Sequence, residues 1–111
     1  MKYSENKVEL TGFAGNDVEL KVLANDKRLS KVNIAVNESY ISTVGAEVKN
    51  TQWFNLIFWN NLADEAAEKI KKGSKLSITG RLVSQQYEKD GIKKYSFEIV
   101  VSEFQTTTKE G

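Results

Sequence analysis

Two tryptophans, Trp53 and Trp59, lie six residues apart in a segment that is rich in aromatic and β-branched residues. That composition favours a β-strand over residues 51–59. Because a strand points successive side chains to opposite faces, the even spacing places both indoles on one face. The other face then carries the apolar side chains Phe54, Leu56 and Phe58. Exposed indoles can stack on flat rings such as nucleobases, whereas indoles covered by a neighbouring subunit would be structural.

Positive charge is concentrated in one part of the chain. Residues 69–94 carry eight basic and two acidic side chains, although the whole chain has a net charge of only +1. Residues 1–40 are neutral in total, and residues 41–68 are acidic. A local excess of lysine and arginine attracts phosphate groups, so residues 69–94 are the segment that favours an anionic partner.

The chain contains no cysteine and no histidine. Their absence excludes disulfide bonds, zinc sites built from these residues, and catalytic triads that depend on them. The Asp and Glu residues are scattered along the sequence, whereas carboxylate catalysis needs convergent titratable groups in a pocket. We therefore expect a binding protein that is not an enzyme and that uses no cofactor and no metal.

A length of 111 residues with 40% hydrophobic residues is typical of one globular domain. No apolar run approaches the roughly 20 residues that are needed to cross a bilayer. The first residues also lack the apolar stretch of a secretory signal. These features predict a cytoplasmic protein that has no membrane segment.

Alternating and helical patterns divide the chain into strands and one helix. Strands are expected over 6–13, 31–37, 51–59, 75–87 and 94–104, with an extended segment at 18–23 and a polar turn at 25–27. Residues 41–50 are expected to form a long loop or a hairpin tip. After residue 59 the period becomes helical, with Asn60 or Asn61 as the cap and Gly73 after the last turn. Asp90-Gly91 predicts the tip of a hairpin between the last two strands.

With one helix between the third and fourth strands, this order matches the five-stranded Greek-key OB-fold barrel, an all-β fold. Its second and third strands and their flanking loops hold oligonucleotides or oligosaccharides. The OB-fold domain is expected over residues 1–104. Residues 105–111 show no periodicity and are expected to form a frayed C-terminal end. The fold alone does not assign a function, so particular residues must do so.

Five segments resemble, in order, those of bacterial single-stranded DNA-binding proteins, and they cover about residues 5–104. They are 6–12 with 15–19, 33–40, 51–58, 62–64 with 71–74, and 78–82 with 87 and 95–101. Val18 departs from the family, which usually has proline there, and Ser84-Gln85-Gln86 replaces basic residues before the aromatic residue of the fourth strand.

The family typically continues into a flexible tail with an acidic tip. This sequence ends at Gly111, either because a tail was removed or because the protein is a tailless variant.

The resemblance implies that four aromatic residues stack on bases: Tyr40, Trp53, Trp59 and Tyr87. Tyr40 shares the parity of the inward-facing Ile34 and Val36, so it can bind only if its strand bulges or ends before it. Phosphate contacts are expected from the cationic side chains Lys7, Lys21, Lys31, Lys72, Arg81, Lys93 and Lys94. Lys49 is a weaker candidate, and Lys27 and Arg28 are interpreted as a solvated turn.

The function that the resemblance implies is sequence-tolerant binding and protection of single-stranded DNA during replication, recombination and repair. The family assembles as homotetramers, although the sequence does not distinguish a tetramer from a dimer. Replication and repair proteins are expected as partners only if the native gene encodes an acidic tail, and the expected location is the cytoplasm, at the nucleoid. The alternatives are an adaptor that resembles primosomal replication proteins of the same fold and, more remotely, a metal-dependent OB-fold nuclease.

Overall fold

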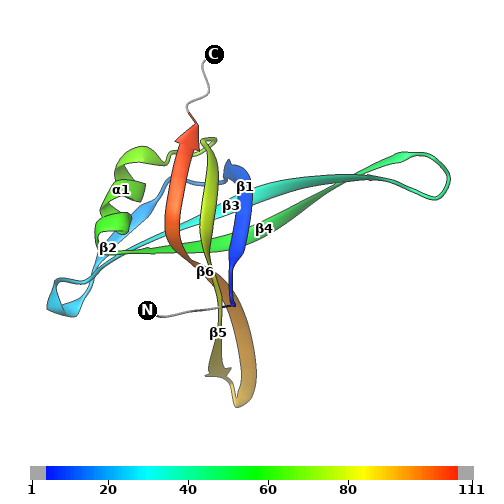
Figure 1. The fold of residues 1–111 in the computed structure, drawn as a ribbon. Helices are drawn as coiled ribbons and strands as arrows, with labels where there is room; N and C mark the ends of the chain where they lie inside the picture. Colours follow the sequence, from blue (N-terminus) through cyan, green and yellow to red (C-terminus); the bar gives the residue numbers. More distant parts are fainter. Residues whose placement is uncertain (1–4, 108–111) are drawn as a thin grey trace.

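The computed structural model describes residues 5–107, which form strands, one α-helix and one short 3-10 turn (Figure 1). The elements follow one another as β1 (Val8–Ala14), β2 (Glu19–Val22), the 3-10 turn η1 (Ala24–Asp26), β3 (Arg28–Ile41), β4 (Glu47–Trp59), α1 (Asn61–Lys69), β5 (Lys75–Lys89) and β6 (Ile92–Thr107). The predicted order of strands and helix is confirmed. The strands are longer than predicted, most clearly around residues 28–30 and 47–50.

The strands close into a barrel. They are paired in the order β1-β5-β6-β4-β3-β2, and β1 also pairs with β3 at Phe13 and Ala14, which closes the sheet on itself. All pairings are antiparallel except that of β4 with β6. Five strands therefore make the barrel, while the short β2 lies on the outer part of β3, and α1 connects the third barrel strand to the fourth. This arrangement confirms the predicted OB-fold.

The core is filled by alternate residues of the barrel strands and by one side of the helix. The fully buried side chains of the strands include Val32, Ile34, Leu56, Phe58, Leu76 and Ile99. Phe58 also packs edge-to-face against Phe104, with ring centroids 5.3 Å apart. Ala63, Ala66 and Ile70 of the α1 region complete the same cluster. The side chains that β4 does not bury on this face are therefore presented outside the barrel.

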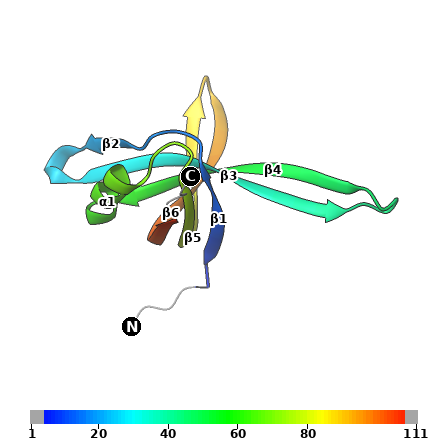
Figure 2. The ribbon, with the colours of Figure 1, turned by 90° about the horizontal axis from the view of Figure 1, so that it is seen from above.

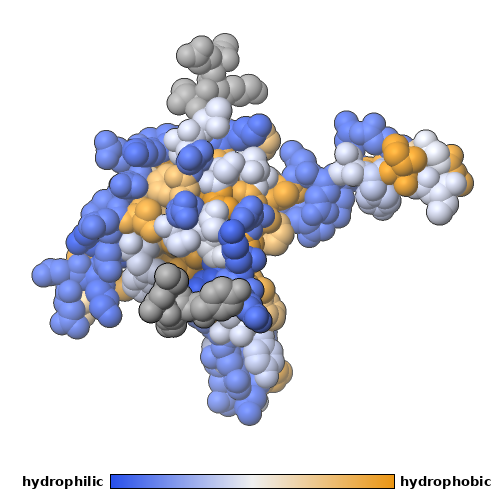
Figure 3. Space-filling view, viewed as in Figure 1, coloured by the Kyte–Doolittle hydropathy of each residue, from blue (hydrophilic) through white to orange (hydrophobic). Residues whose placement is uncertain are grey.

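Two hairpins project from the barrel in different directions (Figures 1 and 2). The β3–β4 ladder continues without interruption to the pair Ile41–Glu47, so only residues 42–46 connect the strands. The predicted long loop over 41–50 is therefore wrong for Ile41 and for 47–50, which are paired in the ladder, while 42–46 form the hairpin tip that was its alternative. The β5–β6 hairpin turns at Asp90 and Gly91, whose φ angles of 54° and 78° fit the predicted two-residue turn. Figure 3 shows apolar surface at the far end of the β3–β4 hairpin.

The predicted frayed end at residues 105–111 is wrong for its first three residues. Gln105, Thr106 and Thr107 extend β6 and pair with Ser77, Leu76 and Lys75 of β5. The sequence pattern missed them because their side chains are all polar and show no apolar alternation. Their place in the sheet comes instead from backbone pairing with β5. Residues 108–111 lie outside the described residues, as do residues 1–4.

Helix α1 follows a sharp change of direction at Asn60, whose φ is 54°. The predicted side-chain cap is not formed, because the Asn60 amide oxygen accepts a hydrogen bond from the backbone N–H of Arg28 at 3.2 Å. At the other end the N–H of Ile70 donates to the carbonyl of Ala66 at 2.9 Å. Across residues 5–107, the structure contains no helix that is long and apolar enough to cross a membrane.

Candidate nucleic-acid interface

The outer face of β4 presents both tryptophans. Trp53 is paired with Ala35, and Trp59 with Leu29, so the indoles stand on the same side of the β3–β4 ladder. Their exposed fractions are 61% and 39%, whereas Phe58 on the other face is fully buried. The predicted division of this strand into an inner and an outer face is confirmed for Leu56 and Phe58 and for the two tryptophans, whereas Ile57, which shares the tryptophan face, is buried. Two exposed indoles on one strand face can offer flat apolar surfaces to a ligand.

Two of the predicted cationic residues share this face. Lys31 is paired with Ile57, which lies between the tryptophans, and Lys21 of β2 is paired with Leu29, the partner of Trp59. Both lysines are exposed. Glu19 is paired with Lys31 and places one carboxylate on the same face. The structure therefore brings Lys21 and Lys31 to the same face as the tryptophans. Both ammonium groups are accessible there, although the carboxylate of Glu19 offsets part of their charge.

Tyr40 does not reach the tryptophan face. It is paired with Val48 in an uninterrupted ladder, so its parity is that of the inner residues Ile34 and Val36. The condition that β3 bulges or ends before Tyr40 is not met, because the strand runs to Ile41. Tyr40 is nevertheless 58% exposed, because the ribbon has already left the barrel at this position. It is accessible on the side of the ribbon opposite Trp53.

The projecting β5–β6 hairpin carries Tyr87, which is 46% exposed and is paired with Lys94. Alternation along β5 places Arg81 on the same face as Tyr87. Lys93 stands on the other face, together with the exposed rings of Tyr95 and Phe97. The structure therefore joins Tyr87, Lys94 and Arg81 on one surface and separates Lys93 from them.

Of the last two predicted cations, Lys7 has a carboxylate partner for its side chain, whereas the bond of Lys72 is made by its backbone. The Lys7 ammonium lies 2.9 Å from the Glu9 carboxylate, and the hydrogen bond and charge of Glu9 raise the pKa of Lys7 above its ordinary value. Lys7 also lines a shallow hollow that includes Arg81. The backbone N–H of Lys72 donates to Asp17 Oδ1 at 2.9 Å, while its side chain is exposed. Lys72 thus lies beside the connection between β1 and β2.

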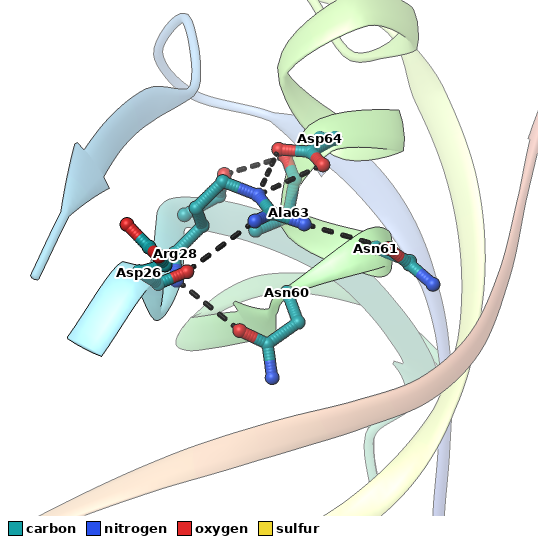
Figure 4. Close-up of polar contacts among 7 residues, drawn as sticks. Asp26, Arg28, Asn60, Asn61, Ala63 and Asp64 are labelled. Carbon is teal, nitrogen blue, oxygen red and sulfur yellow. Dashed lines mark hydrogen bonds and ion pairs between the residues drawn. The ribbon is translucent and has the colours of Figure 1, made fainter.

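The interpretation of Arg28 as part of a solvated turn is wrong. Its guanidinium contacts Asp64 of α1, with Nε 2.8 Å from Oδ1, and its side chain is only 31% exposed (Figure 4). The two residues are 36 positions apart, so no local pattern in the sequence links them. Lys27, in contrast, is exposed as predicted.

Comparison with known proteins gives one consistent result. The family model described as "Single-strand binding protein family" matches residues 5–107. Proteins named single-stranded DNA-binding protein in two strains of Neisseria meningitidis are 34% identical over 101 residues, which is 90% of this chain and 58% of theirs. Single-stranded DNA-binding protein 1 of Chlorobaculum tepidum is 34% identical over 102 residues, 90% of this chain and 63% of its own. The chain thus spans about three fifths of the length of these relatives.

Solved structures share the fold. The Plasmodium falciparum SSB in complex with ssDNA matches with a TM-score of 0.88 at 20% identity, covering 97% of this chain and 99% of that one. A deletion mutant of the single-stranded DNA-binding protein from Thermus aquaticus matches with a TM-score of 0.84 at 20% identity, covering 93% of this chain and 50% of that one. At this level of identity the likeness concerns the barrel architecture.

Proposed function

The chain belongs to the single-strand binding protein family, and on this premise we propose that it binds and protects single-stranded DNA during replication, recombination and repair. Its relatives carry single-stranded DNA binding in their names, and one structure of the same fold is a complex with ssDNA. The proposed mechanism is binding without turnover. Bases stack on exposed aromatic rings while cations follow the phosphates, and the binding tolerates any sequence because every base has a π-face.

The observation that carries this proposal is the exposure of Trp53 and Trp59 together on the outer face of β4. Large indoles are usually buried in a single domain, and exposed aromatic surface marks an interaction site. Lys21 and Lys31 stand on the same face and supply the charge that a strand of phosphates requires. Base stacking at Trp53 and Trp59 explains both features.

Tyr40 and Tyr87 extend the proposed path onto the two hairpins. Because β3 neither bulges nor ends before Tyr40, a DNA strand that reaches this ring must cross to the side of the ribbon opposite Trp53. Each ring is exposed on a ribbon that has left the barrel, so neither is needed to fill the core. Among the cations, Lys21, Lys31, Arg81 and Lys94 share faces with the stacking rings, and we propose them as the main phosphate contacts. Lys7, Lys72 and Lys93 are peripheral in this proposal, because Lys7 already has a carboxylate partner, Lys72 lies beside the connection between β1 and β2, and Lys93 stands on the hairpin face opposite Tyr87.

We propose that the protein acts as a homo-oligomer, a tetramer more readily than a dimer. The supporting feature is strand β1, which pairs with β5 along its length but with β3 only at Phe13 and Ala14. Residues 8–12 therefore present an edge that has no strand partner within residues 5–107, and such an edge can pair with a second copy. Several linked domains would raise the affinity for one long strand through effective concentration.

Two further parts of the proposal concern cellular context. The proposed location is the cytoplasm, at the nucleoid, where replication exposes single strands. Recruitment of replication and repair proteins is proposed only for a native protein that carries an acidic C-terminal tail.

A fluorescence titration with oligo-dT at two salt concentrations tests the proposed function. Both tryptophans are assigned to the DNA face, so saturation should quench their emission, and higher salt should weaken binding as phosphate counterions compete. Duplex DNA of the same length is the control, since paired bases hide the faces that stack. Unchanged emission at saturation would exclude the stacking role, and equal affinity for duplex and single strands would indicate only an electrostatic surface.

A further inference from the structure

The side chain of Arg28, at the start of β3, is bonded to residues of η1 and α1 (Figure 4). Its Nε donates to both carboxylate oxygens of Asp64 in α1, at 2.8 and 2.9 Å. Its Nη1 donates to the carbonyl of Asp26 in η1 at 3.3 Å, and its Nη2 to the Asn61 amide oxygen at 3.4 Å. All three guanidinium nitrogens therefore have acceptors within the protein.

Backbone bonds connect the same arginine to the residue that follows Trp59. The N–H of Asn60 donates to the carbonyl of Arg28 at 2.8 Å, and the N–H of Arg28 donates to the Asn60 side chain at 3.2 Å. The carbonyl of Asn60 accepts the first hydrogen bond of α1, from the N–H of Asp64 at 3.1 Å. Asn60 needs these partners, because a φ of 54° is unfavourable for a residue other than glycine.

These bonds lie close to Trp59, both along the chain and across the ladder. Its successor Asn60 is bonded to Arg28, and its cross-strand partner Leu29 directly follows Arg28. Trp59 is the last residue of β4, where strand ends ordinarily fray. We infer that Arg28 is a positioning residue whose side chain holds the Trp59 indole in its stacking orientation, because it fixes η1 and the start of α1 against β3 at the point where β4 ends. The bonds between Asn60 and the backbone of Arg28 are kept in any variant of this residue, so the side chain is the part that is tested. This inference rests on the proposed function and adds a residue that stands outside the binding face.

Arg28 acts through Trp59 and not through a phosphate contact of its own. Neighbouring residues of a strand point to opposite faces, so Arg28 lies on the other side of β3 from Leu29 and therefore from Trp59. Each of its three guanidinium nitrogens already donates to an acceptor in Asp64, Asp26 or Asn61. An ion pair with this much exposure contributes little to folding stability, so a variant without it is expected to fold.

A double-mutant cycle measures the dependence on Trp59. Affinities for oligo-dT are compared for Arg28→Ala in the unmodified protein and in the Trp59→Ala and Trp53→Ala backgrounds. We expect a loss of about five- to tenfold in the unmodified and Trp53→Ala proteins, and of less than about twofold once Trp59 is absent. Lys27→Ala removes a neighbouring exposed charge and is expected to leave affinity unchanged. Asp64→Asn, which keeps the side-chain shape, should reproduce the direction of the loss.

A second measurement reports on the ring itself and does not require DNA. In the Trp53→Phe protein, Trp59 is the only tryptophan, so its fluorescence anisotropy follows the mobility of one indole. Arg28→Ala should lower this anisotropy, whereas Lys27→Ala should not, and thermal melting confirms that both variants are folded. In the DNA titrations, the slope of log K against log salt should be the same with and without Arg28, because no phosphate contact is lost.

Each remaining outcome overturns the inference. Equal losses in all three backgrounds would mean that Arg28 does not act through Trp59, and a flattened salt plot would make it a phosphate contact. An unchanged anisotropy of Trp59 would show that the ring does not depend on the arginine. If the unmodified protein fails to bind oligo-dT, the proposed function fails, and the anisotropy measurement still decides whether Arg28 positions the indole.

Discussion

The indole of Trp53 lies against Gly15 so closely that there is no space for a side chain between them. A Cβ atom on Gly15 would lie 2.6 Å from Cζ3 of the indole and 3.1 Å from Cη2. The backbone of Gly15 is held in place, because its N–H donates to the carbonyl of Asn33 at 2.8 Å. The absence of a side chain at residue 15 therefore determines where the Trp53 ring rests, although the two residues belong to different segments.

Gly15→Ala should displace the Trp53 ring and weaken DNA binding. The contact is with a side chain that can rotate, so we expect melting to stay near that of the unmodified protein. The loss of affinity should approach the contribution of one stacked base, about 1 to 3 kcal/mol. Titration with oligo-dT and the tryptophan emission of the free protein measure the two effects.

Gly12→Ala is the control for this prediction. A Cβ there would overlap the backbone oxygen of Ala35, which cannot move without separating β1 from β3. That variant should therefore melt at a clearly lower temperature. If Gly15→Ala lowers the melting temperature as much as Gly12→Ala does, residue 15 supports the fold and does not merely seat the indole.

The barrel could be predicted from the sequence because local patterns determine most of it. The alternation in residues 51–59 separated Phe58 from Trp59 correctly, since Phe58 packs in the core while Trp59 is partly exposed, although Ile57 on the tryptophan face is also buried. The Asp90-Gly91 turn was predictable because few residues adopt two successive positive φ angles. The closure of β1 onto β3 followed only from matching the order of elements to a known fold.

The candidate site could be predicted only in part. Parity correctly assigned Tyr40 to the inner face, but parity does not show where a strand leaves the barrel and an inner position becomes exposed. The bond of Arg28 to Asn60, next to Trp59, and the contact of Gly15 with Trp53 were missed, because both join segments that are distant in the sequence. Long-range contacts of single side chains leave no periodic signal.

Tyr40→Ala and Tyr87→Ala should each weaken DNA binding without affecting melting. Both rings are exposed on projecting hairpins, so their removal leaves no cavity in the core. The expected loss is about 1 to 3 kcal/mol for each stacked base. Phenylalanine variants keep the ring and serve as matched controls that should bind almost normally. Equal losses for the alanine and phenylalanine variants would assign the effect to the hydroxyl group and exclude stacking.

Lys31→Ala should change the salt dependence of binding as well as the affinity. Lys31 stands on the tryptophan face, and each phosphate contact that is removed lowers the slope of log K against log salt by about 0.7 for a single strand. Lys27→Ala removes the same charge from an exposed turn and should leave the slope unchanged. Identical slopes for the two variants would exclude Lys31 from the phosphate path.

Trp53→Ala and Phe58→Ala should have opposite consequences, although both remove an aromatic ring from β4. Trp53 is mostly exposed, so its loss should cost about 1 to 3 kcal/mol of binding and little stability, with an unchanged salt slope. Phe58 is fully buried against Phe104, so its loss should lower the free energy of unfolding by about 3 to 5 kcal/mol. Thermal melting and oligo-dT titration of the two variants separate these effects.

Trp59→Ala extends the comparison to the less exposed indole of the same face. Because a larger part of this ring is covered, its removal should combine a stacking loss like that of Trp53→Ala with a modest decrease in melting temperature. If Trp53→Ala and Trp59→Ala both unfold as readily as Phe58→Ala, the outer face of β4 is a structural surface that a neighbouring subunit covers. Normal melting with weak binding would instead place both indoles in contact with DNA, because stability and affinity then depend on opposite faces of one strand.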